Sequence, residues 1–141
     1  MRFLLLFVLF VISPSSQSTN CRKHTYGSVE KDVANAYGKY ESIFVALVQE
    51  TPGGTNEYDL AHGLEYEMTV LQSLKGAVNG QSHRVKVSVF DRMYRFAPGQ
   101  EYLVFGKVEA GYAMVNECSP TGLLSNSLEK LGLLDEISTT R

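Results

Sequence analysis

The chain lacks most of the features that would indicate an enzyme or a nucleic-acid-binding protein. It has only two cysteines in 141 residues, with no Cys-x-x-Cys and no His-Glu-x-x-His motif, so neither a redox pair nor these metal-site patterns are indicated. No basic run is long enough to neutralise a phosphate backbone, and the formal net charge is −2. Internal repeats, low-complexity tracts and Asn-x-Ser/Thr acceptors are also missing. We therefore expect no enzymatic activity, no cofactor and no nucleic-acid partner.

The N-terminal segment has the pattern of a secretory signal peptide. Arg2 is followed by ten apolar residues and then by six that are mostly small and polar. The apolar run is too short to span a bilayer, and no later hydrophobic segment follows, so we expect no membrane anchor. A cut after Ser18 places small residues at −3 and −1 and leaves Thr19 as the first residue. We therefore expect removal of residues 1–18 and export of residues 19–141 as one domain, extracellular or, in a bacterium, periplasmic.

The two cysteines allow one intramolecular pairing. Cys21 and Cys118 are 97 positions apart, and an exported chain meets oxidising conditions. A bridge over this span would remove on the order of 4–5 kcal/mol of unfolded-chain entropy. Two free thiols are the alternative. We expect a structural disulfide that ties the N-terminal segment to the segment around Cys118.

Hydrophobic periodicity predicts a helix near each end of the exported chain. Ser28 can cap the first helix, and Gly38 is placed to end it. The second helix is expected in the leucine-rich segment after Cys118, where Asn126 and Glu129 have the spacing of a capping box.

Five strands are expected between the helices, at residues 43–48, 66–74, 83–90, 102–108 and 112–115. A Pro/Gly/Asn-rich loop at 51–59 and a Pro-Gly turn at 98–99 separate some of them. Strands with these turns and two helices favour a mostly β fold, a five-stranded Greek-key barrel of the OB type.

Six aromatic residues on or near these strands have two interpretations. They could form a stacking surface for a ligand, but strand alternation already explains most of them as core residues. The six are Tyr66, Phe90, Tyr94, Phe96, Tyr102 and Phe105.

Two weak arrangements could suggest catalysis. His62 lies three positions before Glu65 and near Glu67, but no further ligand pattern supports a metal site, and a turn histidine beside solvated acids is favoured. Ser119 lacks the Gly-x-Ser-x-Gly context and an evident base, so a role in a turn or helix entry is favoured.

Several segments occur in an order that is typical of one group of exported proteins. They are residues 43–45, 66–76, 100–108, Gly111, the pair Cys118-Ser119 and the leucine-rich helix. Together they resemble the inhibitory domain of the tissue inhibitors of metalloproteinases, within the netrin-like family. The resemblance covers residues 21–134 and implies an OB-type barrel.

The resemblance also implies a mode of inhibition. Members of the family insert a cysteine-initiated N-terminus into the protease cleft, where the α-amine and first carbonyl chelate the catalytic zinc and the second side chain enters the specificity pocket. On this chain the inhibitory wedge would consist of Thr19, Asn20 and Cys21, with Thr19 binding the target's zinc in trans. The supporting contact loop would consist of Cys118, Ser119 and Pro120.

One disulfide of the family is missing. Thr19 stands where the chelating first cysteine would be, and no cysteine occurs near residues 89–91, where its partner should lie. Any residue can supply an amine and a carbonyl, and an α-amine with a pKa of about 8 can lose its proton to a metal. An untethered wedge must be ordered on binding, however, which should weaken affinity.

Two functions therefore remain open. The first is inhibition of an exported zinc metalloprotease by a monomer, which requires processing directly before Thr19. The second is a non-inhibitory netrin-like module that binds another extracellular protein and is indifferent to that cut.

Overall fold

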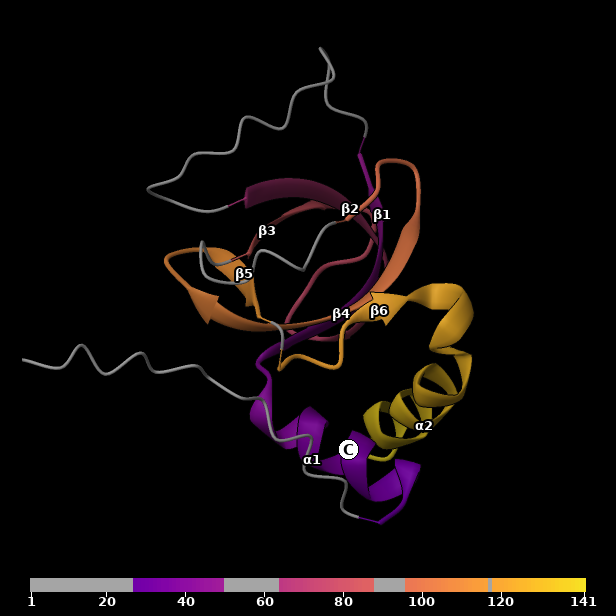
Figure 1. Ribbon diagram of the computed structural model, residues 1–141. Coiled ribbons are helices and arrows are strands. Elements are labelled where there is room, and N and C mark those ends of the chain that lie inside the picture. The colour runs from indigo at the N-terminus through magenta and orange to yellow at the C-terminus, as the bar shows by residue number, and fades with distance from the viewer. Residues whose placement is uncertain (1–26, 50–63, 88–95, 117) are drawn as a thin grey trace, which may run out of the picture.

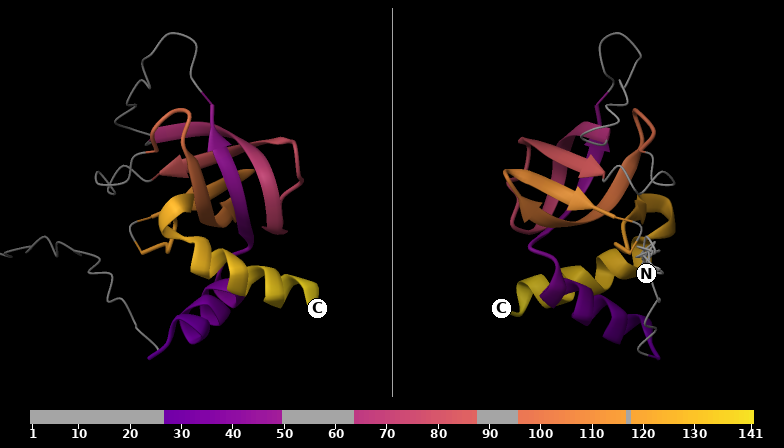
Figure 2. Two further views of the ribbon diagram at one scale, coloured as in Figure 1. Left: turned by 90° about the vertical axis from the view of Figure 1, so that its right-hand side faces the viewer. Right: turned by 60° about the vertical axis from the view of Figure 1, so that its left-hand side comes forward.

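Five strands close into a barrel in the computed structural model, which describes residues 27–49, 64–87, 96–116 and 118–141. Helices α1 (Val29–Lys39) and α2 (Leu128–Thr139) lie against each other on one side of this barrel (Figure 1). Both turned views in Figure 2 show the same arrangement. No described helix is long and apolar enough to cross a membrane.

The strands are β1 (Ser42–Val48), β2 (Leu64–Lys75), β3 (Ser82–Val87), β4 (Glu101–Glu109), β5 (Tyr112–Val115) and the short β6 (Gly122–Leu123). Their order is β1-β2-β3-β5-β4, and the β1–β4 pair closes the barrel. The β3–β5 pair is parallel and the other pairs are antiparallel. The predicted OB-type barrel, with a helix near each end, is therefore confirmed.

Two hydrophobic clusters form the core. One fills the barrel, and the other lies between the barrel wall and the two helices. Strand β1 contributes to both, because Phe44 and Ala46 face the barrel interior while Ile43 and Val45 face the helices. Burial on both faces explains why residues 43–48 form a nearly continuous apolar run without alternation.

Helix α1 begins as predicted but ends later. The Ser28 hydroxyl accepts a hydrogen bond from the Lys31 N–H at 3.3 Å, which caps the helix. Gly38 was expected to end the helix, but it lies inside it, and the helix continues to Lys39 with Tyr40 as its C-cap. The prediction was wrong because Lys75 on β2, and not a turn at the glycine, binds the carbonyl oxygens of Tyr37 and Tyr40 at the end of the helix.

The predicted capping box of the second helix is also wrong. Asn126 belongs to a short 3₁₀ helix, η1 (Leu124–Asn126), and Ser127 occupies the N-cap position of α2. The Ser127 hydroxyl donates to the Leu123 carbonyl oxygen at 2.8 Å, so it turns back toward β6 and does not cap the helix. The chain therefore enters α2 through a local turn at residues 123–127, and not through the expected capping box.

Strand β2 is longer than predicted and serves both clusters. Tyr66, Met68 and Val70 face the barrel interior, as expected from alternation, whereas Leu74 packs in the cluster against the helices. The register of the β1–β2 pair shifts between Ile43 and Phe44 and again two residues later. These shifts change which residues of the two strands lie opposite each other along the pair.

Four of the six aromatic residues lie among the described residues, and all four are buried core residues, as favoured above. Phe96 lies edge-on between Tyr66 and Tyr102, with ring centroids 5.1 and 4.8 Å apart. Phe105 belongs to the cluster against the helices. Phe90 and Tyr94, and the predicted loop at 51–59, lie outside the described residues.

Candidate functional site

The contact loop is the part of the predicted inhibitory site that the structure describes. Cys118, Ser119 and Pro120 follow strand β5 and lead to β6. Thr19 and Asn20 of the wedge, and the signal peptide before them, lie outside the described residues, so these predictions stay predictions.

Cys118 lies at the surface of the barrel. Its residue is exposed, and its N–H donates to the Asn116 side-chain oxygen at 3.0 Å. Its sulfur is disulfide-bonded. The chain's other cysteine, Cys21, lies outside the described residues, so the geometry of the Cys21–Cys118 bridge is not described and the pairing stays a prediction.

Two buried hydroxyl groups fix the rest of this loop to strand β4. Ser119 is 7% exposed and Thr121 is 8% exposed. The Ser119 hydroxyl lies 2.6 Å from both the Phe105 carbonyl oxygen and the Thr121 hydroxyl. The Phe105 N–H in turn donates to the Thr121 hydroxyl at 2.8 Å. Ser119 is thus an anchor of the loop, in agreement with the turn role favoured above.

The position of Phe105 explains this use of hydroxyl groups. Strand β4 pairs with β6 at Tyr102 and Leu103, and with β5 from Lys107 onward. Phe105 lies between these two ladders, so its backbone groups would lack a strand partner on that side. A buried N–H or carbonyl needs a partner, and Ser119 and Thr121 supply one for each.

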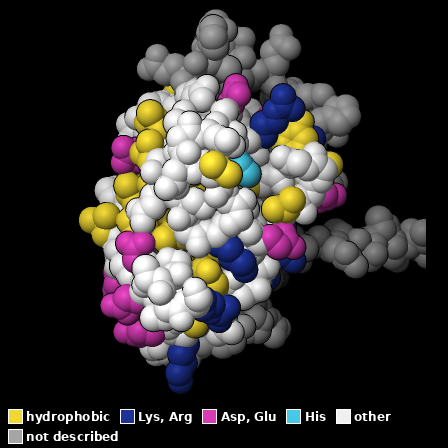
Figure 3. Space-filling model, turned by 180° about the vertical axis from the view of Figure 1, so that it is seen from behind, with side chains coloured by type: hydrophobic (Ala, Val, Ile, Leu, Met, Phe, Trp, Pro, Cys, Tyr) yellow, Lys and Arg dark blue, Asp and Glu magenta, His cyan; other side chains and the backbone are white. Residues whose placement is uncertain are grey.

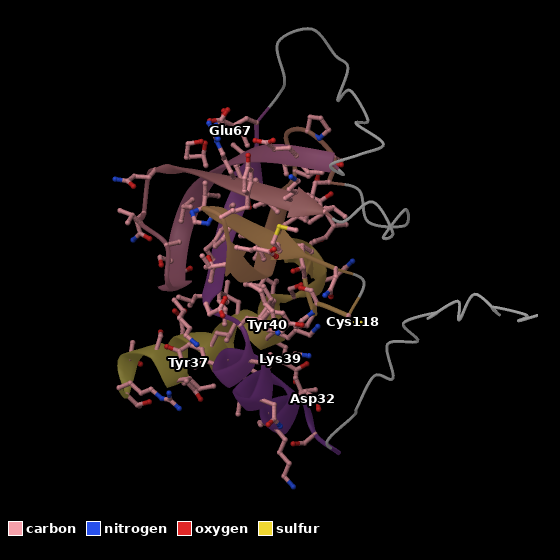
Figure 4. All side chains as sticks on the ribbon, turned by 90° about the vertical axis from the view of Figure 1, so that its left-hand side faces the viewer. Asp32, Tyr37, Lys39, Tyr40, Glu67 and Cys118 are labelled. Atoms are coloured by element: carbon pink, nitrogen blue, oxygen red, sulfur yellow. The ribbon has the colours of Figure 1, made fainter. Side chains whose placement is uncertain are left out.

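Tyr40, at the C-terminal end of α1, supports the contact loop from the side of the helices. Its side chain is 4% exposed, its phenol donates to the Cys118 carbonyl oxygen over 3.4 Å, and its ring lies edge-on to Phe105 at 5.9 Å. Burial raises the pKa of Tyr40 above its ordinary value, so the phenol is protonated at neutral pH and can donate. Figure 4 shows Tyr40 between α1 and the barrel, with Cys118 near it.

Sequence reasoning missed Tyr40. It lies two positions after Gly38, where the first helix was expected to end, and shortly before the first strand. Its partner Cys118 is 78 positions away, and no local pattern connects residues at that distance. Only the packing of α1 beneath the barrel brings the two together.

The other candidate residues do not converge on a site. Glu65 and Glu67 are exposed on β2, and Glu67 accepts a hydrogen bond from the Ser82 hydroxyl at 2.8 Å, far from Cys118 (Figure 4). Within the described ranges no three His, Cys, Asp or Glu side chains are grouped so that they could hold a metal ion. His62 lies outside those ranges.

Hydrophobic side chains also reach the surface of the barrel and of α2. In the face drawn in Figure 3 they lie at several places among charged groups. The exposed large hydrophobic residues are Leu71 at 45%, Val78 at 57%, Val108 at 53%, Leu123 at 37% and Leu128 at 61% exposure. Single exposed hydrophobic side chains are ordinary on a protein surface and do not by themselves mark a binding site.

Comparison with known proteins does not assign a family. No protein-family model matches the chain, and no curated protein matches it. The resemblance to the inhibitors of metalloproteinases therefore remains a hypothesis based on the residues and on the order of the segments.

Proposed function

We propose that this protein is a secreted inhibitor of zinc metalloendopeptidases that acts like the tissue inhibitors of metalloproteinases. The observation that carries the proposal is the exposed, disulfide-bonded Cys118 at the start of a loop anchored to β4. A contact surface that is ordered before binding loses less entropy in the complex. A fixed loop with a bonded cysteine is suited to hold a short N-terminal segment in one direction.

The proposed chemistry needs few groups. Thr19 would provide the α-amine and the first carbonyl oxygen for the protease zinc, and Asn20 would place its side chain in the specificity pocket. Cys21 would anchor the wedge to Cys118. An α-amine with a pKa of about 8 loses its proton to zinc at neutral pH without a catalytic base.

The barrel is one of the observations that support the proposal. An OB-type barrel is the fold expected for a netrin-like inhibitor, but one fold hosts many functions. The fold counts here because it presents the Cys118 loop at the surface, next to the end of α1.

The test compares two one-residue extensions. We would purify the secreted protein, determine its mature N-terminus and disulfide state by intact mass, and measure inhibition of a panel of secreted zinc endopeptidases. One variant carries an extra Ala before Thr19 in the mature chain. The matched control carries an extra Ala after Arg141.

We expect the natural protein and the C-terminal control to inhibit equally. The N-terminal variant should lose at least about 100-fold in affinity, since the α-amine can no longer reach the zinc with the first carbonyl. Equal inhibition by the N-terminal variant would exclude zinc chelation by Thr19. A mature chain that starts elsewhere would exclude it as well.

A second candidate function is a non-inhibitory netrin-like module that binds an extracellular protein. The barrel is expected for such a module as well, because the fold by itself does not require an inhibitory N-terminus. This module would bind its partner equally well with either extension, and no zinc endopeptidase of the panel would be inhibited.

A further inference from the structure

The wedge and the contact loop together form the proposed inhibitory edge, which has a single covalent support. The chain has two cysteines, so one bridge at most can hold the N-terminal segment. The rigidity of the proposed site then depends on how firmly the backbone at Cys118 is held. Non-covalent contacts to that backbone are therefore decisive for the rigidity of the edge.

The backbone at Cys118 is held on both sides. Its N–H donates to the Asn116 side chain at 3.0 Å, and its carbonyl oxygen faces the Tyr40 phenol at 3.4 Å. The next residue, Ser119, is fixed to Phe105 on β4. Among these contacts, only the one from Tyr40 connects the loop to the end of helix α1.

Tyr40 is itself rigidly placed. Its N–H donates to the Ala36 carbonyl oxygen at 3.0 Å, and its carbonyl oxygen accepts from the Lys75 ammonium group at 2.8 Å. Its buried ring packs edge-on against Phe105. The phenol therefore projects from a fixed backbone and a fixed ring, so it can hold a flexible partner with little loss of its own entropy.

We propose that Tyr40 is a positioning residue of the inhibitory edge: its phenol holds the Cys118 carbonyl oxygen and so orients the contact loop and the segment bonded to it. The proposal rests on the proposed function. In this arrangement Tyr40 supplies part of the rigidity that a second disulfide would have given. It touches neither the zinc nor the reacting groups of the protease.

The expected effect is modest. A separation of 3.4 Å is long for a hydroxyl donor, and one hydrogen bond between neutral groups changes an equilibrium constant by about two- to tenfold. Tyr40→Phe removes only the phenol oxygen and keeps the ring contact with Phe105. Replacement of Tyr40 by p-aminophenylalanine keeps a donor at the same place.

The experiment measures inhibition constants, melting temperatures and hydrogen exchange of residues 116–121 for the natural protein and both variants. Tyr112→Phe, which alters a half-buried tyrosine on β5, is the control. We expect Tyr40→Phe to inhibit about two- to tenfold more weakly and to exchange faster at residues 116–121, with little change in melting temperature. The p-aminophenylalanine variant should restore both properties, and Tyr112→Phe should change neither.

Unchanged inhibition by Tyr40→Phe would overturn the proposal, as would a failure of p-aminophenylalanine to restore inhibition. If the natural protein inhibits no zinc endopeptidase, the proposed function fails. Hydrogen exchange then decides whether Tyr40 positions the loop, and unchanged exchange in Tyr40→Phe would reject this as well. If Tyr40→Phe does not fold, 3-fluorotyrosine at position 40 supplies a stronger donor. Inhibition that is then no tighter than that of the natural protein overturns the proposal.

Discussion

Lys75 on strand β2 closes the C-terminal end of helix α1 by binding Tyr37. Its ammonium group lies 2.6 Å from the Tyr37 carbonyl oxygen and 4.9 Å from the centre of the Tyr37 ring, and it also donates to the Tyr40 carbonyl oxygen. The last carbonyl groups of a helix lack intrahelical partners and carry partial negative charge. A cation from a neighbouring strand therefore determines where this helix ends.

Lys75→Met should destabilise the fold. The change keeps most of the side-chain length but leaves two carbonyl oxygens without their charged donor, which should cost about 1–3 kcal/mol of unfolding free energy. Lys107→Met, at an exposed lysine on β4, is the control and should change stability by less than about 0.5 kcal/mol. Urea denaturation measures both, and equal effects would show that Lys75 does not cap the helix.

Ser119→Ala should destabilise the contact loop. The substitution removes the hydroxyl that lies 2.6 Å from both the Phe105 carbonyl oxygen and the Thr121 hydroxyl, in a buried place. Leaving such groups unsatisfied costs about 1–3 kcal/mol. The control is Ser125→Ala, at an exposed serine in η1. A melting temperature that falls by the same amount in both variants would contradict the anchor role of Ser119.

Two glycines should respond in opposite ways to alanine. Gly38 lies inside α1 with open space around an added Cβ, so Gly38→Ala should stabilise the protein by about 0.5–1 kcal/mol. Gly76 has a φ of +68°, and an added Cβ would collide with the Glu41 carbonyl oxygen. Gly76→Ala should therefore destabilise strongly. Thermal unfolding tests the pair, and a shift of the same sign in both would contradict this reading of their backbones.

Stability should fall at mildly acidic pH because of His83. The His83 ring lies 4.8 Å from the Phe44 ring, and burial lowers its pKa below the ordinary value of 6.5. The unfolded chain then binds a proton that the folded chain does not, so stability is complete above about pH 6.5 and falls as pH decreases toward the lowered pKa. Below the lowered pKa, His83 is protonated in both the folded and the unfolded chain, so stability no longer changes with pH through this group.

The measurement is the unfolding free energy of the natural protein and of His83→Gln between pH 5 and 8. Because the variant lacks the titrating ring, its profile should be flatter than that of the natural protein in this range. Identical slopes would assign the pH dependence to other groups, such as the two histidines outside the described residues.

The five barrel strands and their order along the chain could be predicted from residues 43–115, because alternation and turn residues are local signals, whereas the short β6 was not predicted. Burial of the four described aromatic residues could be predicted for the same reason. The pairing of β3 with β5 and the closure between β1 and β4 fit the barrel suggested by that order. The exact end of α1 could not be predicted, because Lys75, a residue distant in the sequence, binds the carbonyl oxygens there.

The candidate site divides in the same way. The sequence by itself determined where the two cysteines and the predicted cleavage point lie, and it favoured a turn role for Ser119. Only the tertiary structure decided what supports them: Phe105 needs two hydroxyl partners because two strand ladders stop on either side of it. Tyr40 meets Cys118 because α1 packs beneath the barrel. Contacts between residues so far apart depend on chain closure and core packing, and no local pattern encodes them.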